Sequence, residues 1–358
     1  MHTILKFALA LIILTEFSNC KSAPQPADIL VQEDMEAPEE TPHNDEIPAE
    51  EIEYEIPFPD EKLPESSFNE VWAYMASNRE RDFKSHYPIS DIVYFAAEID
   101  VYGRLTGVPS RKNIPNFNGR SHLAIVCNST GLTHFVIQSG TEARKQLISE
   151  ILAAAGEYDG INIDMENVPA QDGEHFLSFL SEIRAGLGGK MLSVCVPGRT
   201  RAVGVYSYTA IAAIADRVFV MAYDEHWSGS KPGPVASMEW CKAVAEYGLH
   251  TAGPEKLIMG MPFYGRGWGD KSTSRALIHS TTEGLKRDHE VRDFRRVNGI
   301  PAFSYDVVVN VTVYYEDEYS LAARMQMYRG LGVQNAGFWR LGQETPTIWQ
   351  LIKLSPKR

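Results

Sequence analysis

Polar and apolar side chains alternate along residues 157–167, which read Glu-Tyr-Asp-Gly-Ile-Asn-Ile-Asp-Met-Glu-Asn. Because successive side chains of a β-strand point to opposite faces, a strand here places Asn162, Asp164 and Glu166 on one face. The other face then carries Ile161, Ile163 and Met165. A helix would scatter the three polar groups around its axis. The alternation alone is equally typical of a half-exposed antiparallel strand with a solvated polar face.

The flanking segments favour a buried strand. Helical periodicity covers residues 141–156 before it and 173–187 after it, and an apolar strand follows at 191–197. The order strand, helix, strand implies a parallel sheet that is covered on both faces. Burying two carboxyls in such a sheet is costly unless they line a functional site at the carboxyl end of the strand. We therefore interpret Asp164 and Glu166 as catalytic residues.

Apolar strands separated by amphipathic helical stretches continue through the chain from Ser66 onward. The helical stretches include residues 237–247 and 318–329. Further strands are predicted at 71–75, 92–97, 122–127, 191–196, 217–223, 257–263 and 337–341, with an additional short one at 134–137. This pattern predicts the α/β class and a (β/α)₈ TIM barrel, with the additional strand absorbed at a loop.

The interval between Trp268 and Glu316 is too long for a simple connection, and it contains strand-like runs at 302–306 and 310–315. Structureless loops of this length are uncommon inside compact domains, which favours a small folded insertion over an irregular surface loop. The glycine-rich run 265–269 lacks the Gly-Lys-Ser/Thr ending of a phosphate loop. We interpret it as the mouth of a strand.

The amino-terminal segment, residues 1–20, has the pattern of a lipoprotein-type signal peptide. Lys6 precedes an apolar run at 7–14, which is too short to span a bilayer. Phe17-Ser-Asn-Cys20 resembles a loose lipobox, so Cys20 is a candidate for lipidation and for anchoring the exported protein to a bacterial membrane. The alternative is an unmodified Cys20 thiol near a conventional cleavage site.

Residues 21–65 have a different composition from the rest of the chain. They hold fifteen acidic residues, two lysines and eight prolines, and their net charge of −13 equals that of the whole chain. Such a segment is predicted to be a disordered, extended tether, either a stalk on a membrane or a mere spacer. The remaining residues, 66–358, are neutral overall and carry no basic patch for nucleic acid.

The remaining cysteines and the histidines indicate neither a disulfide framework nor a metal site. Cys127 and Cys195 fall in apolar strands and Cys241 in a helix, where a free thiol behaves as a small buried hydrophobe. The ten histidines show no spacing typical of metal ligands, so we expect no cofactor.

Four segments resemble strand motifs of glycoside hydrolase family 18, in the right order. Residues 159–166, Asp-Gly-Ile-Asn-Ile-Asp-Met-Glu, resemble the family's signature Asp-Gly-x-Asp-x-Asp-x-Glu, with one departure at Asn162. Val-Met-Ala-Tyr-Asp at 220–224 resembles the sixth strand, and 257–266 and 336–342 resemble the seventh and eighth. The resemblance covers about residues 66–358 and is greatest to bacterial members that cut peptidoglycan or spore cortex. It implies a catalytic barrel with a small α+β insertion after the seventh strand, at about 269–316.

Cleavage of a glycosidic bond needs a proton for the leaving oxygen and a nucleophile at the anomeric carbon. Glu166 is the candidate acid. Two carboxylates on one strand face lie only about 6 to 7 Å apart, so this strand supplies no second carboxylate across the sugar. The resemblance implies instead that the substrate's 2-acetamido carbonyl attacks, with retention of configuration.

The resemblance also implies roles for further residues. Asp164 would orient the acetamido N–H and help to keep Glu166 protonated. Tyr223 would donate to the acetamido oxygen, Asp224 would bind sugar hydroxyls or brace Tyr223, and Trp339 would form the floor under the sugar. Weaker candidates for substrate contacts, each of which fits a structural role equally well, are Tyr74, Tyr264, Arg266 and His226.

Asn162 stands where the family usually has aspartate. An asparagine there can hydrogen-bond Asp164 but cannot share a proton with it, and it removes one like charge from the cluster. We expect Asn162 to contribute to substrate binding, activity to survive, and the pH–rate profile to differ from that of aspartate-containing relatives.

These observations predict an exported, lipid-tethered, monomeric hydrolase of β-1,4-linked N-acetylglucosamine polymers, with peptidoglycan as the first substrate and chitin oligomers as the second. One alternative is a catalytically silent carbohydrate-binding protein of the same fold, the chitinase-like lectin type, against which the intact Glu166 argues. Another is a surface adhesin in which the barrel is only a scaffold. The fold alone does not separate the three.

Overall fold

The computed structural model describes residues 62–114, 116–269, 273–292, 295–306 and 310–356. The predicted signal peptide, nearly all of the predicted tether and Cys20 lie outside these residues. Within the described ranges, no helix combines the length and the apolar character needed to cross a membrane.

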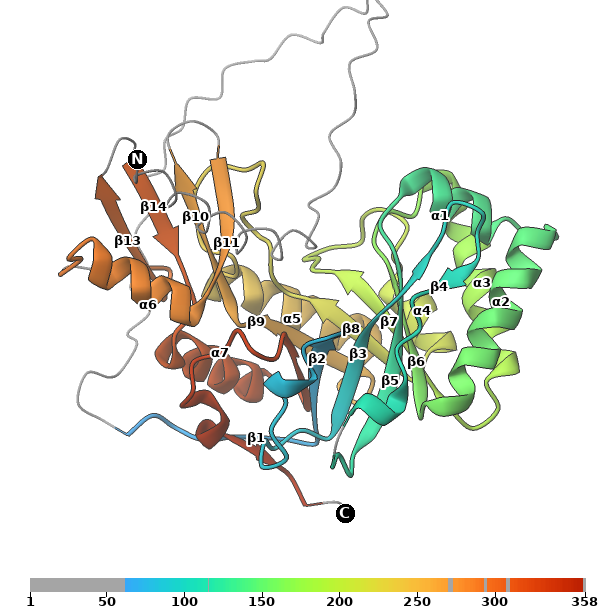
Figure 1. Ribbon diagram of the computed structural model, residues 1–358, viewed down its shortest axis with the longest axis horizontal. Helices are drawn as coiled ribbons and strands as arrows, with labels where there is room; N and C mark the ends of the chain where they lie inside the picture. The colour runs from blue at the N-terminus through green and yellow to red at the C-terminus, as the bar shows by residue number, and fades with distance from the viewer. Residues whose placement is uncertain (1–61, 115, 270–272, 293–294, 307–309, 357–358) are drawn as a thin grey trace, which may run out of the picture. The chain divides into compact units, whose positions relative to one another are not determined.

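Eight parallel strands close into a barrel (Figure 1). Each strand pairs with the next in the order of the chain, and the last strand returns to the first, with Asn335 opposite Glu70. The strands are β2 (Glu70–Ala76), β3 (Asp91–Ile99), β5 (Arg120–Cys127), β6 (Gly160–Met165), β7 (Met191–Pro197), β8 (Arg217–Met221), β9 (Leu257–Pro262) and β15 (Asn335–Trp339). This architecture confirms the predicted (β/α)₈ barrel.

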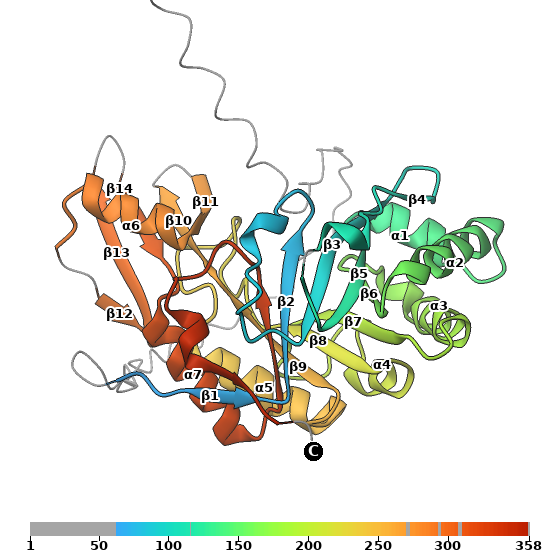
Figure 2. The ribbon, with the colours of Figure 1, turned by 60° about the horizontal axis from the view of Figure 1, so that its bottom comes forward.

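Helices cover the outside of the barrel, with α2 and α3 standing outside β5 and β6 in both ribbon views (Figures 1 and 2). They are α1 (Thr130–Ile137), α2 (Glu142–Ala154), α3 (Gly173–Gly186), α4 (Tyr208–Ile214), α5 (Met238–Ala252) and α7 (Glu318–Leu331). Local sequence fixes several of their starts: the Ser237 hydroxyl accepts a hydrogen bond from the Trp240 N–H, and Asp317 with Ser320 forms a capping box.

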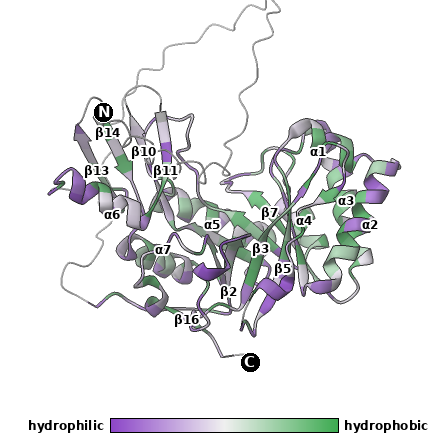
Figure 3. Cartoon of the chain, in the orientation of Figure 1, coloured by the Kyte–Doolittle hydropathy of each residue, from purple (hydrophilic) through white to green (hydrophobic). Residues whose placement is uncertain are grey.

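Two apolar layers hold the barrel together. The larger layer lies between strands and helices and takes in Ile161, Ile163 and Met165, the apolar face predicted for β6. The smaller layer fills the inside of the barrel and includes Tyr74 and Phe219. Hydropathy colouring shows the same division, with hydrophobic strands such as β3 and β7 inside and hydrophilic residues on the outer helix α2 (Figure 3). Asn162 and Asp164 therefore point into the barrel.

The short strand predicted at residues 134–137 is wrong, because this segment is the second half of helix α1. The Ser129 hydroxyl accepts a hydrogen bond from the Leu132 N–H and begins the helix. Thr133, Val136 and Ile137 are buried at helical spacing. A short apolar run does not distinguish a buried strand from one face of a helix, and here the capping residue decides.

A small α+β insertion follows the seventh barrel strand and rules out the irregular loop. It stands beside the barrel, on the side away from α2 and α3 in both views (Figures 1 and 2). It holds helix α6 (His279–Asp288) and a five-stranded sheet in the order β11-β10-β14-β13-β12. The strands are β10 (Tyr264–Gly269), β11 (Thr273–Ile278), β12 (Arg295–Val297), β13 (Ile300–Asp306) and β14 (Asn310–Tyr314). The sheet begins at Tyr264, slightly before the predicted start near 269.

Two short strands join the ends of the described chain. Strand β1 (Ser66–Phe68) pairs in parallel with β16 (Ile352–Leu354). A two-residue strand, β4 (Leu105–Thr106), pairs with the end of β3. Neither belongs to the closed barrel.

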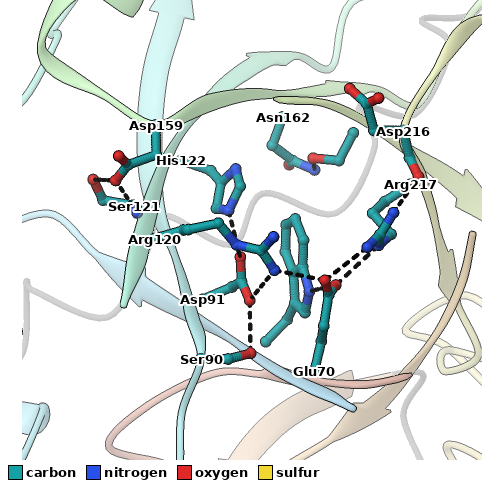
Figure 4. Close-up of polar contacts among 12 residues, drawn as sticks. Glu70, Ser90, Asp91, Arg120, Ser121, His122, Asp159, Asn162, Asp216 and Arg217 are labelled. Atoms are coloured by element: carbon teal, nitrogen blue, oxygen red, sulfur yellow. Dashed lines mark hydrogen bonds and ion pairs between the residues drawn. The ribbon is translucent and has the colours of Figure 1, made fainter. Parts of the chain in front are cut away.

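Charged side chains close the barrel at the amino-terminal ends of its strands (Figure 4). We call the group of Glu70, Asp91, Arg120, His122 and Arg217 the barrel floor. Four of its members are the first residues of their strands, and His122 is the third residue of β5. Because parallel strands begin at the same end of a barrel, these side chains meet although they are far apart in the sequence.

The barrel floor is held by paired, hydrogen-bonded charges. The Glu70 carboxylate accepts bonds from Arg120 Nη2 at 2.6 Å and from Arg217 Nε and Nη2 at 2.9 and 2.7 Å. Arg120 also binds both oxygens of Asp91, which lies 2.8 Å from His122 Nε2. Burial opposes ionisation of Glu70, but the bonds and charge of Arg217 and Arg120 outweigh it and lower its pKa.

Candidate active site

Strand β6 carries the two predicted catalytic carboxyls to the carboxyl-terminal end of the barrel, which we call the mouth. Asp164 lies inside the barrel and is 4% exposed, whereas Glu166 follows the last strand residue and keeps an exposed surface. Tyr206 holds this strand end in place, because its hydroxyl donates to the Met165 carbonyl at 2.6 Å and accepts from the Val168 N–H at 3.2 Å. The position of Glu166 is thereby fixed on both sides.

The two carboxyls hold protons more tightly than ordinary carboxyls. Burial raises the pKa of Asp164 well above its usual range, and the nearby Glu166 raises it further. Protein atoms around the Glu166 carboxyl also raise its pKa, and the negative charge of Asp224 adds to this rise. Both carboxyls therefore favour the protonated form more than an ordinary carboxyl does. Such a pair has a proton available for an acid-catalysed step.

Asn162 lies below Asp164, completely buried, and its amide is bonded away from that carboxyl. Its Oδ1 accepts from the Tyr74 hydroxyl at 3.0 Å, and its Nδ2 donates to Ser193 Oγ at 2.9 Å. The hydrogen bond to Asp164 that the sequence analysis allowed is not formed among the described residues. Within the described chain, Asp164 Oδ1 is buried without a hydrogen-bond partner.

Tyr223, Asp224 and Tyr264 come together at the mouth from two neighbouring parts of the chain. Tyr223 and Asp224 follow strand β8, and Asp224 has a left-handed φ of 57°, which aspartate tolerates better than most residues. The Tyr264 hydroxyl donates to Asp224 Oδ1 at 2.6 Å, and the rings of Tyr223 and Tyr264 lie 6.2 Å apart. Burial raises the pKa of Tyr223 well above its usual range, so its hydroxyl keeps its proton and can donate it.

Trp339 ends strand β15 at the same mouth. Its ring packs against Tyr74 at 5.2 Å and edge-on against Phe95 at 4.7 Å between ring centroids. Tyr74 itself is buried, at 1% exposure, below Trp339 and beside Asn162. Trp339 therefore lies at the barrel mouth, and Tyr74 supports its ring from inside the barrel.

Arg266 and His226 lie further from the two carboxyls. Arg266, on strand β10, pairs with Asp224 at 3.7 Å, and its buried Nε has no partner in the described residues. His226 Nδ1 lies 2.8 Å from the Pro234 carbonyl within its own loop. Arg266 thus faces the mouth, whereas His226 has a structural contact.

Sequence reasoning missed three residues of this site: Ser193, Cys195 and Tyr206. Ser193 and Cys195 share the inward face of β7, and the Cys195 thiol lies 3.0 Å from the Tyr74 hydroxyl and 3.4 Å from Asn162 Oδ1. The sequence indicates Cys195 only through its spacing of two from Ser193, which marks a polar face within an apolar strand. Nothing in the sequence around Tyr206 indicates its contact with the end of β6.

Comparison with known proteins relates these features to one family. A sequence model described as glycosyl hydrolases family 18 matches residues 116–344. The candidate sporulation-specific glycosylase YdhD of Bacillus subtilis is 31% identical over 242 residues, which are 63% of this chain and 57% of YdhD. The cortical fragment-lytic enzyme of Bacillus anthracis is 26% identical over 243 residues, which are 63% of this chain and 56% of that enzyme. The chain thus spans just over half the length of these relatives.

A solved structure shares the fold. The spore cortex-lytic enzyme SleL of Bacillus cereus superposes with a TM-score of 0.73 at 23% identity, over 82% of this chain and 77% of that chain. At this level of identity the likeness establishes the barrel architecture and nothing finer.

Proposed function

Since the family match covers more than half of its length, the chain belongs to glycosyl hydrolase family 18, and we propose that it hydrolyses polysaccharides that contain β-1,4-linked N-acetylglucosamine. The observation that carries this proposal is the placement of Asp164 inside the barrel on β6 and of Glu166 directly after that strand, at the barrel mouth. The surroundings raise the pKa of both carboxyls. A carboxyl whose pKa is raised keeps its proton to a higher pH than an ordinary carboxyl, as a general acid requires.

The proposed mechanism is substrate-assisted and retains the anomeric configuration. Glu166 delivers a proton to the leaving oxygen, and the substrate's 2-acetamido carbonyl attacks the anomeric carbon. Asp164 accepts a hydrogen bond from the acetamido N–H, which orients the carbonyl for attack. Water then opens the cyclic intermediate, with Glu166 now acting as the base. Strand β6 supplies no second carboxylate across the sugar, which favours this mechanism over one with a carboxylate nucleophile.

Other residues at the mouth would bind the sugar. The Tyr223 hydroxyl donates to the acetamido oxygen and holds the carbonyl in position for attack on the anomeric carbon. Trp339 packs under the sugar ring, and Asp224, held by Tyr264, accepts bonds from sugar hydroxyls. Arg266 lies beside Asp224 and would contact the neighbouring sugar unit.

We propose peptidoglycan as the first substrate and chitin oligomers as the second. The cortical fragment-lytic enzyme and the cortex-lytic enzyme SleL are relatives whose names refer to spore cortex, and they support this order. The proposal is tested by digesting both polymers with the purified protein and identifying the products by mass spectrometry. Fragments with reducing-end N-acetylglucosamine are expected, with the β-anomer formed first.

Two variants decide between hydrolysis and binding. Glu166→Gln removes the acid and is expected to reduce turnover by roughly 10²- to 10⁴-fold. Glu142→Gln changes an exposed carboxylate on helix α2 and is expected to leave turnover unchanged. If the unmodified protein retains these sugars in a pull-down but cuts neither polymer, the hydrolase proposal fails and a carbohydrate-binding protein takes its place.

The proposed location is outside the cytoplasm, on a bacterial membrane through a lipid on Cys20. The charged start, the short apolar run and the lipobox-like segment before Cys20 support it. Cys20→Ser is expected to move the protein from the membrane fraction to the soluble exported fraction. An unchanged distribution would contradict lipidation.

A further inference from the structure

Arg199, at the barrel mouth, has no partner within the described chain. It follows strand β7 and is partly buried, and its side chain forms no hydrogen bond or ion pair with any described residue, although its Nε is fully buried. Every other buried or partly buried arginine among the described residues forms at least one such contact. Buried polar groups in proteins are nearly always bonded, so Arg199 has the features of a side chain whose partner comes from outside the chain.

The segment that carries Arg199 lies between the two segments that carry the site. Strand β7 pairs on one side with β6, which leads into Glu166, and on the other side with β8, which leads into Tyr223. The last pair between β7 and β8 joins Pro197 to Met221. Arg199 and Tyr223 each follow two residues later, so the register brings them to about the same height at the mouth.

Gly198 determines the side on which Arg199 leaves the backbone. A Cβ on Gly198 would lie 2.8 Å from the Trp240 ring of the outer helix α5, so this side of the backbone faces outward. The Gly198 N–H donates to the Met221 carbonyl at 3.2 Å, which continues the strand ladder past β7. Because successive residues of a strand face opposite sides, the Arg199 side chain leaves toward the mouth.

The Arg199 guanidinium lies against the loop that supports the end of β6. Its Nη2 is 3.9 Å from the point where a Cβ on Gly204 would stand, two residues before Tyr206. The Tyr206 hydroxyl bonds to the backbone on both sides of Glu166. Burial raises the pKa of Tyr206, and the charges of Glu166 and Asp164 raise it further. The Arg199 charge opposes this rise, so the arginine acts on the same hydroxyl as the two carboxyls.

We propose that Arg199 is a specificity-determining residue, which binds a carboxylate carried by the sugar that leaves when the bond is cut. Arginine matches a carboxylate with two parallel N–H···O bonds. In peptidoglycan every second sugar carries a lactyl ether on O3, whose carboxylate is either free or extended by a peptide with carboxylates of its own. Cleavage after N-acetylglucosamine makes this sugar the leaving group, beside Glu166. Chitin oligomers carry no carboxylate, so the contact favours peptidoglycan over chitin.

This inference rests on the proposed hydrolase function, and its first test compares soluble glycan oligosaccharides of equal length. One has free lactyl carboxylates, one has the lactyl groups amidated, and one carries peptides. Arg199→Gln is expected to lower the ratio of kcat/KM for the free-acid substrate to that for the amidated one by roughly tenfold. Arg199→Lys keeps the charge without the planar fork and is expected to lower it less. Arg201→Gln removes an exposed charge from the same loop and is expected to leave the ratio unchanged.

The peptide-bearing oligosaccharide identifies the source of the carboxylate. If Arg199→Gln lowers kcat/KM relative to the amidated substrate only when peptides are present, Arg199 binds a carboxylate of the peptide. If it does so for the free-acid substrate, Arg199 binds the lactyl carboxylate. Ratios that stay unchanged for both substrates, or an equal fall for acidic and amidated substrates, would overturn the proposal.

Binding separates failure of this inference from failure of the proposed function. In a Glu166→Gln background, calorimetry gives the Kd of each oligosaccharide with and without Arg199→Gln. Roughly tenfold weaker binding of the acidic oligosaccharides alone, with a smaller difference at high salt, supports the role of Arg199 even if the unmodified protein cuts no polymer. Failure to cut then overturns only the proposed function. Equal Kd values with and without Arg199→Gln overturn the role of Arg199.

Urea unfolding checks that the variant is folded. Because the Arg199 side chain has no partner in the described chain, the unfolding midpoint of Arg199→Gln is expected not to fall. A clear fall would contradict the proposal, because Arg199 would then be held by contacts within the protein.

Discussion

Replacing Glu70 by glutamine tests how much the barrel floor contributes to stability. The Glu70 carboxylate accepts four hydrogen bonds: one from Trp72 Nε1 at 2.9 Å, one from Arg120 and two from Arg217. Glutamine fills the same volume but keeps only one acceptor oxygen. Two of the four donors therefore lose their partner, and both arginines lose a neutralising charge.

The expected loss in the free energy of unfolding is about 3 kcal/mol. Breaking a fully buried ion pair costs about 3 to 5 kcal/mol, and a hydrogen bond to a charged group contributes about 1.5 to 3 kcal/mol. The side chains of Arg120 and Arg217 are 39% and 22% exposed, so water can replace part of what they lose. Water cannot replace the bond of the Trp72 N–H in the same way, because Trp72 is fully buried. The exposed arginines lower the expected loss and the buried Trp72 N–H limits that reduction, so we place the loss at the lower end of the range for buried ion pairs.

Urea unfolding measures this loss directly. With a slope of about 3 kcal/mol per molar, the unfolding midpoint of Glu70→Gln is expected to fall by about 1 M. Glu142→Gln removes an exposed pair with Lys145 and is expected to change stability by less than about 0.5 kcal/mol. A loss below about 1 kcal/mol in Glu70→Gln would refute the argument, because the floor charges would then contribute no more than surface pairs.

Three further predictions concern buried carboxyls. Asn162→Asp places a like charge near Asp164 and is expected to raise its pKa, which shifts the pH profile of kcat/KM upward; an unchanged profile would count against this. Because the folded-state pKa of Asp164 is raised, ionisation of this carboxyl lowers the free energy of unfolding as pH rises above about 4. Asp164→Asn lacks this loss. Between pH 4 and pH 7 its free energy of unfolding, measured in urea, is therefore expected to rise by at least about 1 kcal/mol relative to that of the unmodified protein. Equal differences at the two pH values would contradict it. Glu316→Gln leaves the fully buried Arg324 charge without its partner and is expected to lower the free energy of unfolding in urea by about 3 to 5 kcal/mol. A loss near zero would mean that water solvates the Arg324 guanidinium in the variant.

The alternation along β6 and the order of strands and helices were sufficient to predict the barrel and the inward position of Asn162 and Asp164. Both signals are local, because each depends on residues within one or two elements. The error at residues 134–137 has a local cause too: four apolar-rich residues fit a strand and a helix face equally well.

The contacts among distant residues could not be predicted in this way. Cys195 looked like one more apolar strand residue, and its contacts with Tyr74 and Asn162 depend on the register of three strands. The salt bridges of the barrel floor join residues up to 147 positions apart, and each charge alone resembles an ordinary strand end. Such groups become visible only when closure of the barrel sets which strand starts lie together.

The barrel floor also has a consequence for folding kinetics. Its central contact joins the first barrel strand to the sixth, so it forms only after most of the chain between Glu70 and Arg217 has folded. We expect such a contact to be absent from the folding transition state, so that its removal changes the unfolding rate more than the folding rate. The barrel floor is therefore expected to have little effect on the folding rate and to slow the unfolding of the closed barrel.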